Sequence, residues 1–115
     1  MPVVYVFGLP SELTSDDIEK LYRELDATLT SIKECLRSGE AVFFFPPDRM
    51  ALDLGKEIVV RVEGLNITEP EVPIRDGVAA KLGEVVKVRF PEALVMVYVI
   101  PYDFQWGRWS SASKT

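Results

Sequence analysis

The chain carries the same order of landmarks twice, and this internal duplication constrains its fold more than any other feature. A Gly-Leu pair at 8–9 recurs at 64–65, and each pair closes an apolar stretch. The segment FPPD at 45–48 is matched by IPYD at 100–103. The two offsets are 56 and 55 residues, which indicates that one structural unit is repeated. The expected parts are repeat one (2–48), repeat two (57–103) and a C-terminal tail (104–115) of a single domain spanning 1–115.

Repeat one has the pattern of two strands joined by a helix. The expected elements are a strand at 3–9, a helix at 13–39 and a strand at 40–48. Apolar residues recur at helical spacing through the middle segment. Thr14 and Asp17 fit a capping box at its start, and Gly39 is a natural stop.

Repeat two follows the same plan. The expected elements are a strand at 56–65, a loop at 66–76, a helix at 77–90 and a strand at 93–103. Both helical connections are long enough for right-handed parallel crossovers. The sequence therefore predicts an α/β fold in which a tandem βαβ–βαβ repeat forms a four-stranded mixed sheet, with both helices on one face. The other face would be too apolar to leave in water, so we expect it to mediate oligomerisation.

Composition excludes several classes of protein. With 115 residues and 48% hydrophobic content, the chain can build the core of one domain. No stretch reaches the roughly 18 apolar residues of a membrane span, and no signal peptide is evident, so we expect a cytoplasmic protein without a membrane partner. A net charge of −5 argues against a nucleic-acid partner. The single Cys35 excludes an internal disulfide.

The absence of histidine excludes several kinds of catalytic and metal-binding site. The chain has none, which removes Ser–His and Cys–His pairs as well as histidine-ligated metal sites. Pro2 offers an alternative base, because methionine is commonly removed ahead of proline and leaves a secondary amine. An α-amine has a pKa near ~8, which burial or a nearby cation lowers toward the range that suits a proton shuttle. The simpler interpretation is a proline tolerated at the first position of a strand.

The duplication with proline at position 2 resembles the tautomerase superfamily, which includes 4-oxalocrotonate tautomerase and macrophage migration inhibitory factor. The resemblance spans residues 2–110. It is carried by Pro2 with its strand, Pro46-Pro47-Asp48, EIVVRVEGL and VYVIPYDFQWGRW. It implies a homotrimer with sites between subunits, no metal and no organic cofactor. The implied activity is proton transfer in a keto/enol carboxylate.

The resemblance also implies roles for individual residues. Pro2 would be the catalytic base and acid, and Tyr98 would donate a hydrogen bond to the substrate. The alternative for Tyr98 is an amphipathic core tyrosine. Arg75 resembles the helix-start arginine of the short tautomerases. Arg37 lies close to the position of a substrate-facing lysine of the family, after a gap of one residue.

Three further residues are candidates for substrate binding. Arg61 lies on the polar face of its strand between two glutamates, where the simpler interpretation is an ion pair inside the trimer. Trp106 and Trp109 would wall an apolar pocket or attach the tail to a neighbouring subunit. Ser11-Glu12 stand where the family has a substrate-binding arginine, so a two-arginine grip on a dicarboxylate is not expected. A smaller or more apolar keto/enol acid, anionic or aromatic, fits better.

Two alternatives to a tautomerase-type enzyme stay open at this point. Ferredoxin-like modules share the βαββαβ order and bind RNA or small ligands without catalysis, but they pair their second and third strands. A tautomerase-fold protein without catalytic activity could instead act as a structural or signalling trimer.

Overall fold

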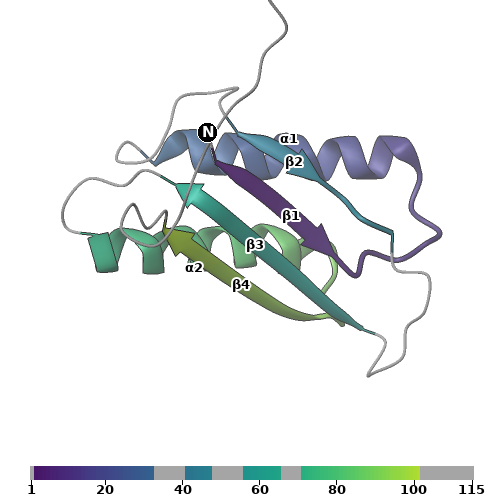
Figure 1. The fold of residues 1–115 in the computed structure, drawn as a ribbon. Helices are drawn as coiled ribbons and strands as arrows, with labels where there is room; N and C mark the ends of the chain where they lie inside the picture. Colours follow the sequence, from purple (N-terminus) through teal and green to yellow (C-terminus); the bar gives the residue numbers. More distant parts are fainter. Residues whose placement is uncertain (1, 33–40, 48–55, 66–70, 102–115) are drawn as a thin grey trace, which may run out of the picture.

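The computed structural model describes residues 2–32, 41–47, 56–65 and 71–101 (Figure 1). Its elements are β1 (Val3–Phe7), α1 (Ser15–Ser31), β2 (Val42–Phe44), β3 (Glu57–Leu65), α2 (Glu71–Arg89) and β4 (Leu94–Pro101). The four strands form one mixed sheet in the order β2-β1-β3-β4. β1 pairs with β2 and β3 pairs with β4 in parallel, while an antiparallel pairing of β1 with β3 joins the two halves. The predicted α/β architecture is confirmed.

The strand order excludes the ferredoxin-like alternative. That alternative requires the second strand to pair with the third. In the structure, β1 separates β2 from β3, and β2 forms one edge of the sheet. Each βαβ half is therefore a parallel unit of its own, and the two units meet at the centre.

Both helices cover one face of the sheet, and the core lies between these layers (Figure 1). Alternate strand residues point toward the helices, as the period of a β-strand requires. The fully buried side chains are Val4, Val6, Leu21, Leu25, Leu29, Ile58, Val60, Val62, Val78, Leu82 and Val86. Burying each such side chain contributes roughly 1.5–3 kcal/mol relative to leaving it exposed. The apolar stripe predicted for the first helix thus faces the core, and so do Val78, Leu82 and Val86, which recur at helical spacing in α2.

α1 begins as predicted and ends earlier than predicted. The Asp17 amide donates to Thr14 Oγ1 at 3.2 Å, and Asp17 Oδ2 accepts from the Thr14 amide at 3.0 Å, which confirms the capping box. The helix ends at Ser31, and Ile32 is extended, whereas the sequence placed the stop at Gly39.

The composition of the last helical turns explains the early end. The hydroxyls of Thr28 and Thr30 donate back to the carbonyls four residues earlier, and β-branched side chains have low helix propensity. The last turn also has no basic residue to interact with the helix dipole. The apolar periodicity therefore overestimated the length of α1.

α2 begins earlier than predicted, at Glu71 instead of residue 77. The prediction treated the prolines of this segment as a loop signal. Pro73 is the third residue of the helix, where the first turn has no intrahelical donor to lose. Arg75 consequently lies within the helix and not ahead of it.

The duplicated glycines are backbone requirements. Gly8 and Gly64 have φ of 86° and 73°, and no other described residue has a positive φ. A Cβ on Gly8 would lie 2.2 Å from the carbonyl oxygen of Glu57, so a side chain has no room there. Gly64 lies at an irregularity of β3, between Glu63 and Leu65. The repeated Gly-Leu pair therefore marks equivalent bends in the two halves.

Candidate functional site

Pro2 lies directly before β1, at the end of the sheet where β3 finishes (Figure 1). It is buried, and its carbonyl accepts a 3.0 Å hydrogen bond from the Val42 amide at the start of β2. Val3, the next residue, pairs with Glu63 near the end of β3. These contacts fix the position of Pro2.

A row of four side chains crosses the helix-free face of the sheet. The register places Phe44 opposite Tyr5, Tyr5 opposite Arg61, and Arg61 opposite Tyr98. These residues alternate with core residues along their strands and therefore point away from the helices. We call this surface the open face, and define it by the row Phe44, Tyr5, Arg61 and Tyr98.

Arg61 is held at the middle of the open face by aromatic rings and a carboxylate. Its guanidinium carbon lies 5.1 Å from the Tyr5 ring centroid and 6.0 Å from that of Phe7. Tyr5 in turn stacks on Phe7 and Phe44, with centroids 5.8 and 5.6 Å apart. Arg61 Nε lies 3.0 Å from Glu63 Oε1, so the ion pair suggested by the sequence is present within the chain. A cation over ring faces contributes about 0.5–1 kcal/mol at such exposed sites.

Tyr98 lies on the open face and not in the core. The residue is 52% exposed, and its hydroxyl lies 4.0 Å from the sulfur of Met96 on the same strand. The interpretation of Tyr98 as a core tyrosine is therefore wrong. Its phenol is accessible to a ligand or to a neighbouring chain.

Pro2 and Tyr98 do not meet within one chain. β3 lies between β1 and β4, so the strands that carry them are two spacings apart, or about 10 Å. Tyr98 is also level with Tyr5, three residues beyond Pro2, which adds about 10 Å along the strand. The two backbone positions are therefore about 14 Å apart, which favours a site shared between chains over one within a chain.

The other predicted site residues have different outcomes. Arg75 is half-buried in the second turn of α2. Arg37, Trp106 and Trp109 lie outside the described residues. Within the described ranges, no group of three or more histidine, cysteine or acidic side chains could hold a metal ion. No helix there is long and apolar enough to cross a membrane.

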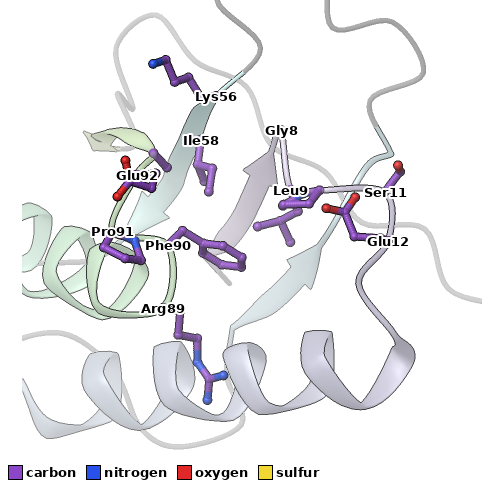
Figure 2. Close-up of a pocket in the computed structure, with 12 residues that line it drawn as sticks. Gly8, Leu9, Ser11, Glu12, Lys56, Ile58, Arg89, Phe90, Pro91 and Glu92 are labelled. Atoms are coloured by element: carbon purple, nitrogen blue, oxygen red, sulfur yellow. The ribbon is translucent and has the colours of Figure 1, made fainter.

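A pocket of about 530 Å³ opens at the end of the sheet opposite Pro2 (Figure 2). Its walls are residues 8–12 after β1, Lys56 and Ile58 at the start of β3, and residues 89–93 between α2 and β4. Sequence reasoning missed this pocket. The only available signal was the Gly-Leu landmark, which marks the bend that brings the segment after β1 beside the start of β3.

An ion pair between the two helices fixes one side of this pocket. Arg89 Nε donates to Glu24 Oε2 at 3.0 Å, and a second guanidinium nitrogen donates to Glu24 Oε1. This hydrogen bonding lowers the pKa of Glu24 below its ordinary value and raises the pKa of Arg89. The guanidinium of Arg89 therefore points toward α1 and away from the pocket (Figure 2).

Comparisons with known proteins identify the fold. No protein-family model matches the chain, and no curated protein matches it. Among solved structures, a domain of unknown function (DUF1904) from Sebaldella termitidis ATCC 33386 has a TM-score of 0.68 and 17% identity, over 97% of this chain and 98% of that one. A 5-carboxymethyl-2-hydroxymuconate isomerase from Deinococcus radiodurans R1 has a TM-score of 0.52 and 14% identity, over 97% and 90%. A 5-carboxymethyl-2-hydroxymuconate delta-isomerase has a TM-score of 0.57 and 9% identity, over 96% and 89%.

These isomerases are tautomerase-superfamily enzymes, so the resemblance noted in the sequence is confirmed at the level of the fold. Because the identities are low, the comparisons establish the architecture alone. The chain has a tautomerase-like fold.

Proposed function

We propose that the protein is a tautomerase or isomerase that moves a proton within a keto/enol carboxylate, with the nitrogen of Pro2 as base and acid. The observation that supports this most strongly is the buried position of Pro2 at the head of β1, in a fold shared with isomerases of keto/enol acids. The proposal requires that the methionine before Pro2 be removed, because an acylated proline nitrogen is not basic.

The chemistry follows from the properties of a buried amine. An apolar environment disfavours the charged form and lowers the pKa of an amine toward neutrality. The neutral nitrogen takes a proton from the substrate hydroxyl or α-carbon, which leaves a delocalised enolate. The resulting ammonium returns the proton to the other end of the enolate, so the amine is regenerated. Tyr98 donates a hydrogen bond to the enolate oxygen.

The proposed site is shared between chains. The separation of Pro2 and Tyr98 within one chain favours a Tyr98 that comes from a neighbouring chain. Large apolar side chains of the open-face side remain exposed, including Phe44 at 48% and Ile100 at 44%, which favours burial against other copies in a homotrimer. The proposed compartment is the cytoplasm.

Arginines supply the proposed carboxylate contact. Arg75 and Arg37 are proposed as substrate ligands, because arginine grips a carboxylate through two parallel hydrogen bonds. Arg61 is a further proposed ligand, although its pairing with Glu63 already satisfies part of its charge. Trp106 and Trp109 are proposed as the apolar wall. Ser11-Glu12 supply no cation after β1, which favours an aromatic monocarboxylic keto/enol acid over a dicarboxylate.

The test combines intact-mass spectrometry with an assay of phenylenolpyruvate ketonisation. The mass should show loss of the methionine, and Pro2→Ala should lower kcat/KM by at least a hundredfold. Pro47→Ala, at an exposed proline of the chain, is the matched control and should stay within about twofold of wild type. An N-terminal extension that acylates Pro2 should abolish activity as well.

Two outcomes would contradict the proposal. Equal rates for wild type and Pro2→Ala would exclude Pro2 as the base. An assembled protein with a free Pro2 nitrogen and no activity on phenylenolpyruvate or on 5-carboxymethyl-2-hydroxymuconate would favour the non-catalytic alternative, a binding or structural module with this fold.

A further inference from the structure

The pocket at the end of the sheet opposite Pro2 has an apolar floor. Figure 2 shows the side chains of Leu9, Ile58 and Phe90 converging on its middle. Ile58 is 2% exposed and belongs to the core. Leu9 and Phe90 are partly buried and pack against the core. The volume, about 530 Å³, lies within the range of roughly 300–1,000 Å³ that is usual for small-molecule sites.

The floor is fixed by hydrogen bonds of the segment that carries Phe90. The Ala93 amide donates to the Phe90 carbonyl at 3.0 Å, and Lys87 Nζ donates to the Ala93 carbonyl at 2.6 Å. Arg89 is anchored to α1 through Glu24. The segment that carries Phe90 is therefore held from both sides, and the apolar floor is preformed.

Exposed charged side chains of both signs lie at the rim of the pocket, outside the apolar floor. Lys56, Glu12 and Glu92 line the pocket, and among the described residues none of the three side chains forms an ion pair. The carboxyl end of α2 also adjoins the pocket, and the partial negative charge of a helix carboxyl end favours a cation, here next to Lys87 and Arg89 of the last turn. A purely anionic ligand would face two carboxylates, and a purely cationic one would face the Lys56 ammonium. A ligand that carries one charge of each sign avoids both conflicts.

We propose that this pocket binds a small zwitterion with an apolar or aromatic side chain, of the chemical class of the α-amino acids. The side chain would lie on Leu9, Ile58 and Phe90. The ligand carboxylate would lie toward Lys56, and its ammonium toward Glu92 and the carboxyl end of α2. The inference is independent of the proposed activity, because Leu9, Ile58, Phe90, Lys56 and Glu92 have no role in the proposed catalytic site.

The test is an NMR titration of the full chain with three ligands that share one ring. L-phenylalanine carries both charges, 3-phenylpropionate carries only the carboxylate, and 2-phenylethylamine carries only the ammonium. Phenylalanine should bind at least tenfold more tightly than either analogue. It should perturb the backbone amides of the non-proline residues in the pocket walls at 8–12 and 89–93, which are Gly8, Leu9, Ser11, Glu12, Arg89, Phe90, Glu92 and Ala93. Pro2→Ala should leave this binding unchanged, so its failure and that of the proposed activity are distinguishable.

Two substitutions separate the contributions of the charges. Lys56→Met should weaken phenylalanine and 3-phenylpropionate several-fold and leave 2-phenylethylamine unchanged. Glu92→Gln should weaken phenylalanine and 2-phenylethylamine and leave 3-phenylpropionate unchanged. The matched controls are Lys81→Met and Glu84→Gln, at exposed positions of α2 outside the pocket, which should bind like wild type.

Three outcomes would overturn the inference. Perturbations spread evenly over the surface would show that the pocket is not a site. Equal affinity for all three ligands would show binding by the apolar floor alone. An analogue that binds as tightly as phenylalanine would show that the pocket recognises only one of the two charges. Circular dichroism of each variant would confirm that a loss of binding is not a loss of fold.

Discussion

The two faces of the sheet are built from the same strands and have opposite character. On β3, Val60 and Val62 are fully buried under the helices, while the neighbouring Val59, Arg61 and Glu63 lie on the other side. The covered face is mainly aliphatic, with Phe43 and Phe45 packed against its edge, and it holds the fold together. The open face combines rings, aliphatic side chains and one arginine held between them. A one-residue step along a strand therefore separates residues for folding from residues available for association and chemistry.

The largest expected difference between the faces comes from truncating adjacent valines of one strand. Val60→Ala should lower the free energy of unfolding by about 2 kcal/mol, because it removes buried methyl groups and leaves a cavity. Val59→Ala, on the half-buried open face, should cost less than about 1 kcal/mol at low protein concentration. Urea unfolding measures both values. If the two substitutions cost the same in the dissociated chain, the two faces do not differ in the way described.

A charge on the open face should break association without breaking the fold. Phe44→Asp places a carboxylate in a surface that the proposed assembly would bury, where an unpaired charge is costly. The expected result is at least a tenfold weaker assembly in light scattering, with an unchanged circular dichroism spectrum. Val88→Asp is the control, since Val88 is 75% exposed on α2. If light scattering gives assemblies of Phe44→Asp and Val88→Asp the same molar mass as the wild-type assembly, the open face is not the association surface.

Arg61, at the centre of the open face, should be coupled to the aromatic rings beside it by a free energy smaller than the cost of Val60→Ala. A double-mutant cycle with Arg61→Met and Tyr5→Leu should give a coupling of about 0.5–1 kcal/mol, the usual value for a cation over an exposed ring. Chemical denaturation of the four proteins measures it. A coupling near zero would mean that Arg61 is held by Glu63 alone.

The sequence predicted the parts of the fold that depend on periodicity. The alternation in EIVVRVEGL assigned Arg61 and Glu63 to one face, and the helical spacing of Val78, Leu82 and Val86 identified the buried side of α2. The ends of the helices were wrong, because Thr28 and Thr30 shortened α1 by side-chain competition and Pro73 was tolerated in the first turn of α2. Periodicity carries no information about such terminal effects.

The site was less predictable than the fold, for a geometric reason. The neighbours of Arg61 are Tyr5 on β1 and Tyr98 on β4, and their alignment depends on the register of two strand pairings. The sequence also suggested Pro2 and Tyr98 as partners, yet the strand order places them about 14 Å apart in one chain. The pocket beside Phe90 arises from three distant segments and has no motif of its own. Each of these features depends on which strands are adjacent.

A similarly small effect is expected in the helix layer, where charges pair at the surface. Hydrogen bonding to Arg89 depresses the pKa of Glu24 in the folded chain, so this carboxylate stabilises the fold at pH values above its unfolded pKa of about 4.5. That stabilisation is lost as the pH falls through the lower folded pKa. Glu24→Gln should therefore cost on the order of 0.5–1 kcal/mol at neutral pH, and should weaken the dependence of stability on pH below about 4.5.

Thermal unfolding across pH 2–7, with and without salt, measures this effect. Glu19→Gln is the matched control, because Glu19 pairs with Arg23 within α1 and not with the other helix. It should cost only about 0.3–0.5 kcal/mol. If Glu24→Gln destabilises the chain as much as Val60→Ala does, the contact between the helices rests on charge as well as on the aliphatic core. If Glu24→Gln instead costs only about 0.5–1 kcal/mol, the covered face is stabilised by burial, and the surface charges between the helices add little to the free energy of unfolding.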